Sequence, residues 1–151
     1  MEEVRPALVC RVLDLSCALP LEAVIETMRP LPVEAVSGMP RFVLGISIIR
    51  GGPVVVVDAG LLLGHRASTA GRAVTVRAAS RTIALLVDAV IGVRTLTARS
   101  VAELPPLLDK AAGDAVAAIA ALDNELLLVL RAARLVPDDL PTGVALEGAE
   151  A

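Results

Sequence analysis

The side chains that could do acid–base, nucleophilic or metal chemistry are few in this chain of 151 residues. The single histidine, His65, lies in a stretch rich in Gly, Ser and Thr that is typical of a linker. The two cysteines, Cys10 and Cys17, fall in neighbouring apolar runs, and their positions suggest neither a nucleophile–base pair with a histidine nor a metal-ligand cluster. An enzyme needs several convergent titratable groups. We therefore expect no catalytic site, no metal site and no cofactor.

The most conspicuous short motif is Arg50-Gly51-Gly52-Pro53. It is glycine-rich, but it lacks the Gly-Lys-Ser/Thr ending of a phosphate-binding loop. The apolar runs Gly45–Ile49 and Val54–Val57 flank it, and β-branched runs on either side of Gly and Pro are typical of a β-hairpin. Arg50 would then sit where the chain reverses and point at solvent or at a partner. A plain solvated turn charge is the alternative for this residue.

Two aspartates, Asp58 and Asp88, each follow an apolar run. Such residues most often cap a strand end or form a turn, and contact with a partner is the alternative. Cys10 and Cys17 lie close enough in one predicted hairpin to approach each other. Because no secretory signal precedes them, we expect reduced, buried core residues rather than a disulfide.

Composition excludes several classes of protein. The chain is 56% apolar with one Phe and no Trp or Tyr, so its core must consist of Val, Leu, Ile and Ala. The formal net charge is −3 and the 14 basic residues are scattered, which argues against nucleic-acid binding. No uncharged apolar run approaches the roughly 20 residues that span a bilayer. The sequence starts Met-Glu-Glu, so we expect a cytoplasmic protein without direct membrane insertion.

The elements that carry these residues occur twice. Sliding the chain by 66 residues places Ala7–Ile25 on Ala73–Ile91 without a gap, with identity at seven of nineteen positions. The hairpin repeats at a shift of 73, which places Val54–Val57 on Leu127–Leu130 and Arg50-Gly51 on Asp123-Asn124. Sheets of this size with a buried face favour small barrels. The pattern predicts two similar β-barrel subdomains side by side, with a groove between them.

Two further segments have local signals. Ala59–Leu63 has the composition of a helical turn after a strand. The Ala-rich segment Lys110–Ala121 could be helical in part, although Gly113 and Asp114 argue against a long helix.

The order of motifs from Pro40 to Asp58 resembles the CheW-like family, the coupling proteins of bacterial chemosensory arrays. Elsewhere, Val24-Ile25-Glu26 and Leu85–Val90 resemble elements of the same family, so the resemblance covers nearly the whole chain. The matching residues are Pro40, Phe42, Gly45, Arg50-Gly51, Val54–Val57 and Asp58.

The resemblance implies a mainly β fold of two pseudo-symmetric, five-stranded SH3-like β-barrel subdomains with a few short helices. We expect one CheW-like domain over residues 7–140, with approximate repeats at 7–66 and 72–136. Strand exchange between the barrels is one option. Residues 1–6 and 141–151 are expected to be flexible termini.

The resemblance also implies a non-enzymatic adaptor. Its partners would be the regulatory domain of a CheA-type histidine kinase and the cytoplasmic tip of a chemoreceptor. Alternatives are a scaffold of a non-flagellar, pilus-type or other array, a detached regulatory domain of the kinase, and a small-ligand-binding β-barrel. The residues expected to bind partners are Arg50, Gly45, Gly51, Val24, Glu26, Thr27, Asp58, Val87 and Val90.

Overall fold

The computed structural model describes residues 4–97, 101–103 and 115–135. Within them the chain forms mostly β-strands joined by short links, with one short α-helix and two 3-10 turns. In chain order the elements are β1 (Val4–Val12), β2 (Leu15–Pro20), η1 (Leu21–Ala23), β3 (Val24–Met28), β4 (Val43–Ile49), β5 (Gly52–Asp58), α1 (Ala59–Leu62), β6 (Arg72–Ala78), β7 (Arg81–Val87), β8 (Ala89–Thr97), β9 (Val101–Glu103), β10 (Val116–Leu122), β11 (Glu125–Leu130) and η2 (Ala132–Arg134).

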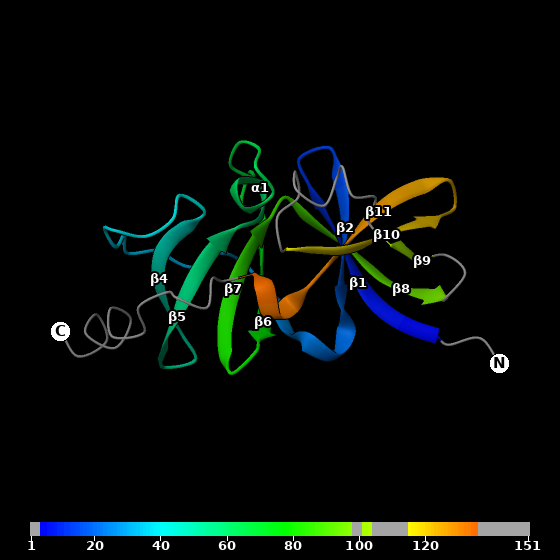
Figure 1. Ribbon diagram of the computed structural model, residues 1–151. Helices are drawn as coiled ribbons and strands as arrows, with labels where there is room; N and C mark the ends of the chain where they lie inside the picture. The colour runs from blue at the N-terminus through cyan, green and yellow to red at the C-terminus, as the bar shows by residue number, and fades with distance from the viewer. Residues whose placement is uncertain (1–3, 98–100, 104–114, 136–151) are drawn as a thin grey trace.

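The strands form two sheets that lie side by side (Figure 1). Sheet A has the order β8-β1-β2-β11-β10-β9, and sheet B has the order β3-β6-β7-β5-β4. Neighbours pair antiparallel except for β2 with β11 and β5 with β7, which pair parallel. The predicted mainly β fold with two similar sheets and few helices is confirmed, and the short β9 adds a sixth strand to sheet A.

The two sequence repeats are confirmed strand by strand. A shift of 66 residues superimposes β1, β2 and β3 on β6, β7 and β8, and a shift of 73 superimposes β4 and β5 on β10 and β11. The pairing registers agree as well. Val55 pairs with Ile83 in sheet B, and the equivalent residues Leu128 and Cys17 pair in sheet A. The pseudo-symmetry therefore extends from the sequence to the hydrogen-bond register.

The repeats 7–66 and 72–136 are nevertheless not the two sheets. Sheet A takes β1 and β2 from the first repeat and β8, β10 and β11 from the second, while sheet B takes the complementary set. Each sheet therefore combines strands of both repeats. The link between β7 and β8 is the single residue Asp88, which is too short for a hairpin loop of at least about two residues, so β8 does not pair with β7. The equivalent link between β2 and β3 is three residues long, Leu21–Ala23, and β3 likewise enters the other sheet.

Local differences from the sequence predictions are few. β1 begins at Val4, so residues 4–6 belong to sheet A rather than to a flexible terminus. The helical turn after β5 is present as α1. The expectation of partial helix is wrong over Val116–Ala121, which belongs to β10. Residues 104–114 and 136–151, including the acidic tail, lie outside the described residues.

One apolar core joins the two sheets. Its buried members include Leu19 from sheet A and Val57, Leu85 and Val87 from sheet B. These four side chains are fully buried, and each contributes about 1.5–3 kcal/mol by leaving water. Two smaller buried clusters lie on the faces of the sheets opposite the main core. Because the main core draws on both sheets, the sheets stabilise each other.

Asp88 fastens the corner between β7 and β8. Its carboxylate accepts hydrogen bonds from the backbone N–H of Leu13 at 2.8 Å and of Thr69 at 3.2 Å, and its own N–H donates to Arg11 at 2.9 Å. Partial burial acts to raise the pKa of this carboxyl, but the hydrogen bonds, aided by the charge of Arg66, outweigh that effect and lower the pKa.

We expect Asp88→Ala to lower the free energy of unfolding by about 1–2 kcal/mol at neutral pH, because two backbone donors lose their acceptor. A carboxyl whose pKa is lower in the folded state stabilises the fold above the unfolded value of 3.8. That contribution is lost as the pH falls through the folded pKa. Urea unfolding at neutral and acid pH should therefore show the deficit of Asp88→Ala shrinking below a pH of about 4. Asp88→Asn, which keeps an acceptor but does not titrate, should differ from Asp88→Ala by a pH-independent amount.

Candidate functional site

Arg50 lies at the tip of the β4–β5 hairpin, as predicted. Arg50 and Gly51 have φ values of +56° and +79°, the positive values that a type I′ turn requires at both central residues. This conformation suits Gly51 but is costly for an arginine. The equivalent turn of β10–β11 carries Asp123-Asn124, residue types that adopt positive φ more readily. Turn geometry therefore does not explain an arginine here, and its side chain is 77% exposed.

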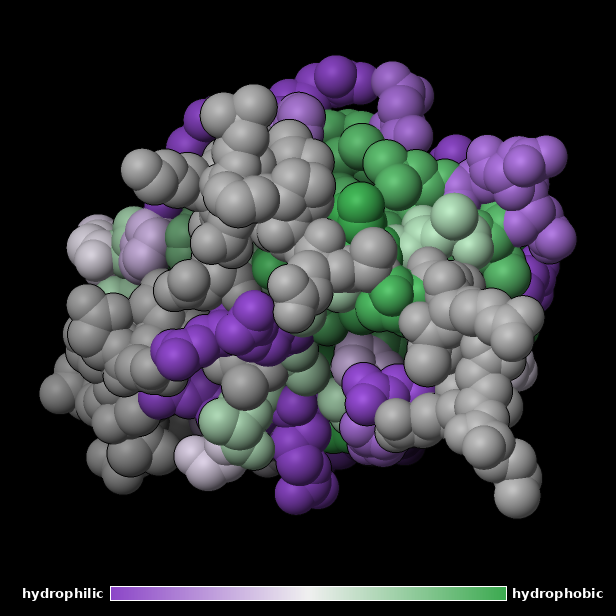
Figure 2. Space-filling model, turned by 45° about the vertical axis from the view of Figure 1, so that its right-hand side comes forward, coloured by the Kyte–Doolittle hydropathy of each residue, from purple (hydrophilic) through white to green (hydrophobic). Residues whose placement is uncertain are grey.

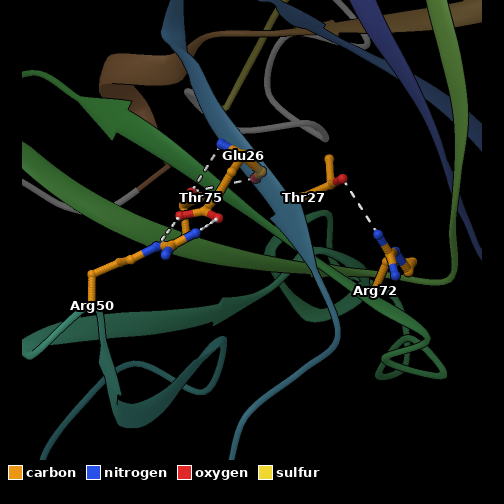
Figure 3. Close-up of polar contacts among 5 residues, drawn as sticks. All are labelled: Glu26, Thr27, Arg50, Arg72 and Thr75. Carbon is orange, nitrogen blue, oxygen red and sulfur yellow. Dashed lines mark hydrogen bonds and ion pairs between the residues drawn. The ribbon is translucent and has the colours of Figure 1, made fainter.

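Glu26 of β3 forms a bidentate ion pair with Arg50 (Figure 3). The Arg50 Nε atom donates to Glu26 Oε2 at 3.0 Å, and Nη2 donates to Oε1 at 2.6 Å. The hydrogen bond from Arg50 lowers the pKa of the Glu26 carboxyl, and the same bond raises the pKa of Arg50. Both residues were predicted to bind partners, and the structure joins them directly although they are 24 positions apart.

Thr75 of β6 holds Glu26 in place. The Glu26 N–H donates to Thr75 Oγ1 at 3.1 Å, and Thr75 Oγ1 donates to the Glu26 carbonyl at 3.3 Å. Thr75 is 2% exposed, and its contacts lie where the β3–β6 register shifts between Val24 and Glu26. The sequence predictions missed Thr75. Its signal is one polar residue inside the apolar run Ala73–Val76.

Thr27 takes part through a neighbouring contact, because Arg72 Nη2 donates to Thr27 Oγ1 at 3.4 Å. We call Glu26, Thr27, Arg50, Arg72 and Thr75 the β3 polar cluster (Figure 3). It holds no nucleophile activated by a base, and the described residues contain no group of three or more side chains that could hold a metal ion. It does present a fixed guanidinium. Arginine has five N–H donors and Glu26 occupies two, so others remain for a second acceptor.

Exposed apolar side chains border the cluster. Ile25, next to Glu26 at the bulge of β3, is 49% exposed, and Ile48, two residues before Arg50, is 57% exposed. A fixed charge beside exposed apolar side chains is typical of a protein-binding surface. Apolar residues also reach the surface elsewhere, and Figure 2 shows a group of them on one face with hydrophilic residues above and below it.

The remaining predicted partner-binding residues have other positions. Gly45 is buried in β4, and Gly51 lies in the exposed turn. Val24 and Val90 are partly buried against the main core. Asp58 and Val87 are 1% and 0% exposed, so both side chains face the interior and could act on a partner only indirectly. The end of an apolar strand does not reveal whether its last side chain points inward.

Asp58 has a structural role that its burial explains. Its carboxylate caps α1 by accepting from Leu61 N–H at 3.0 Å, and it also accepts from the Ser68 N–H at 3.0 Å and the Ser68 hydroxyl at 2.7 Å. The carboxylate thereby fixes the loop after α1 against the end of β5. This outcome matches the strand-end cap that the sequence favoured.

A cavity of about 400 Å³ lies in sheet A. Arg5 and Glu22 are the charged residues of its lining, and the rest of the lining is apolar, from Pro6, Leu96, Val129 and their neighbours. Its lining lies outside sheet B, the sheet that carries the β3 polar cluster.

Comparisons with known proteins agree with this fold. The model of the CheW-like domain family matches residues 6–139. The solved structure of the scaffolding protein TtCheW from Thermoanaerobacter tengcongensis superimposes with a TM-score of 0.76 at 23% sequence identity, covering 85% of this chain and 90% of that one. The curated proteins returned no match. Among the described residues no helix has the length and apolarity needed to cross a membrane. The chain belongs to the CheW-like domain family.

Proposed function

We propose that this chain is a non-enzymatic cytoplasmic adaptor that couples chemoreceptors to a CheA-type histidine kinase in a bacterial chemosensory complex. Membership of the CheW-like family supports a scaffolding role. The observation that carries the proposal is the bidentate Arg50–Glu26 ion pair, which is exposed at a hairpin tip and held from below by Thr75.

The kinase regulatory domain would dock on the β3 polar cluster. The guanidinium of Arg50 is oriented by Glu26 before any partner arrives, which reduces the side-chain entropy lost on binding. Its remaining N–H donors suit a carboxylate or a backbone carbonyl of the partner. Ile25 and Ile48 supply apolar area beside the charge. A central arginine with apolar neighbours is the usual composition of an interface hot spot.

The receptor tip would dock separately, near Val24 and Val90. These residues occupy equivalent positions in the two repeats, one in sheet B and one in sheet A, and both pack against the core that the sheets share. A helical tip that contacts both would bridge the two sheets. The same surfaces would serve a non-flagellar or pilus-type array, and the genes adjacent to this one would separate the two systems.

We expect Arg50→Ala to weaken capture of the kinase regulatory domain by at least about tenfold, as removal of an interface arginine commonly does. The fold should remain, since an exposed ion pair adds little stability, and the melting temperature should change by less than about 2 °C. Titration calorimetry with the purified regulatory domain measures the affinity, and co-sedimentation with a receptor-tip fragment measures array assembly.

The matched control is Arg41→Ala, which removes another exposed arginine from the loop before β4 and should leave capture unchanged. The exchange variant Glu26→Arg with Arg50→Glu tests the ion pair itself. It should restore the folded contact between the two positions but not the affinity, because the partner would meet the opposite charge. If Arg50→Ala binds the kinase regulatory domain with wild-type affinity, the proposed docking surface is wrong.

A further inference from the structure

The two cysteines of the chain face each other across the β1–β2 hairpin. Cys10 and Cys17 are directly paired in the antiparallel register. Both are free thiols, and both are 1% exposed within the same apolar core cluster. Since side chains alternate between the two faces of a strand, membership of one cluster places both thiols on one face of the hairpin. The two sulfur-bearing side chains are therefore cross-strand neighbours.

The other repeat shows that packing alone does not require this pair. The residues equivalent to Cys10 and Cys17 are Val76 and Ile83, which are also directly paired and 0% exposed. Branched aliphatic side chains thus fill the same place in the β6–β7 hairpin. The thiols of β1–β2 differ from them in chemistry rather than in burial or position.

The spacing of paired strands permits a covalent bond between the cysteines. Directly opposed residues of an antiparallel pair have Cα atoms about 4.5–5.5 Å apart, within the roughly 4.4–6.8 Å found in disulfides. Their Cβ atoms are about 4.5–5.5 Å apart, against about 3.5–4.5 Å in a disulfide. Closure therefore needs a small local adjustment of the hairpin and no change of its register.

We propose that Cys10 and Cys17 form a reversible thiol–disulfide pair that covalently locks the β1–β2 hairpin when the chain meets a small-molecule disulfide oxidant. One cysteine thiolate attacks the oxidant and releases one small thiol, leaving a mixed disulfide on the protein. The second cysteine thiolate then attacks the mixed disulfide and releases the second small thiol. The protein loses two electrons and two protons, and the oxidant is reduced to two thiols.

The folded core controls when this reaction can occur. Burial raises the pKa of Cys10 to about 12, and burial together with the neighbouring Cys10 raises the pKa of Cys17 to about 12. Because the thiolate is the reactive form, the closed hairpin should react slowly. Oxidation should proceed during folding or when the hairpin opens, and the product is then protected by the same burial.

The test is to refold the full chain in a buffer of oxidised and reduced glutathione, trap free thiols with iodoacetamide, and map the cysteine peptides by mass spectrometry. We expect a Cys10–Cys17 disulfide within one chain. The oxidised protein should melt roughly 5 °C above the reduced protein, and unfolding in dithiothreitol followed by refolding under reducing conditions should abolish the difference.

The internal repeat supplies the control variant, Cys10→Val with Cys17→Ile, which copies the pair of β6–β7. Because it adds side-chain volume to a buried core, it should melt somewhat below the reduced wild type, and its melting temperature should not respond to oxidant. It should also keep its affinity for the kinase regulatory domain, so failure of this inference is separable from failure of the docking surface. Glutathione adducts or linked dimers as the sole wild-type products, or a disulfide that lowers the melting temperature, would overturn the inference.

Discussion

Replacing Gly45 with alanine is expected to destabilise the fold by more than about 3 kcal/mol, a large part of the total stability of a small domain. A Cβ at this position would lie 1.9 Å from the carbonyl oxygen of Glu34 and 2.9 Å from Cα of Ala35. Both are backbone atoms, so no flexible side chain can move aside. The residue also has φ +148°, a conformation that L side chains rarely adopt.

The clash would displace the segment that covers β4. Glu34 and Ile46 exchange two backbone hydrogen bonds, Glu34 N–H to Ile46 O at 2.8 Å and Ile46 N–H to Glu34 O at 2.9 Å. Both bonds would be strained or lost in Gly45→Ala. Urea unfolding followed by circular dichroism measures the change.

Gly92→Ala is the matched control. Gly92 has nearly the same φ, +144°, but the nearest atom to an added Cβ is the flexible Arg94 Nη1 at 3.4 Å. This variant carries the conformational strain without the backbone clash, and it should cost about 1 kcal/mol. Equal losses in the two variants would show that φ alone, and not the close approach of Glu34, requires glycine at position 45.

Asp58→Ala is expected to cost about 3 kcal/mol. Three donors, the Leu61 N–H, the Ser68 N–H and the Ser68 hydroxyl, would lose a buried carboxylate acceptor, and unpaired buried donors and lost caps are each worth about 1 kcal/mol or more. Chemical denaturation measures the loss, and hydrogen exchange should show earlier opening at Leu61 and Ser68.

Asp58→Asn provides the comparison, because asparagine is also a good N-cap residue and keeps one acceptor oxygen. Its loss should be about half that of Asp58→Ala. At a temperature where it is folded, Asp58→Asn should bind the kinase regulatory domain as wild type does. If Asp58→Asn lost binding as expected for Arg50→Ala but kept its stability, the purely structural role of Asp58 would be contradicted.

The internal repeat made most strands predictable from the sequence. The shift of 73 residues placed Val54–Val57 on Leu127–Leu130 and thereby indicated a second strand of the same kind, which is β11. The helical expectation at Val116–Ala121 failed because pairing with β9 and β11 overrides local propensity. The assignment of strands to sheets was not predictable in the same way, because it depends on pairing between strands of different repeats.

The candidate site was predictable only in its local part. Arg50 stood out because an arginine interrupts a glycine-rich turn, and Glu26 followed from the family resemblance. Their ion pair is a contact between distant parts of the chain, as is the anchoring of Glu26 by Thr75. A single sequence does not show directly which distant residues contact each other. Burial of Asp58 and Val87 likewise depends on which face of each strand meets the core.

The exchange of hairpins between the repeats also governs how the molecule assembles. Sheet A is complete only after β8, β10 and β11 of the second repeat have paired with β1 and β2 of the first. Sheet B likewise needs β6 and β7 of the second repeat beside β3, β4 and β5 of the first. A break in the linker between α1 and β6 would separate the chain into two fragments. Each fragment would contain some strands of both sheets, and neither would contain a complete sheet. Such fragments should fold only by complementing each other, so the linker is a natural place to split this protein into a two-part reporter. By the same logic, two intact chains at high concentration hold interchangeable halves and have a direct route to a domain-swapped dimer.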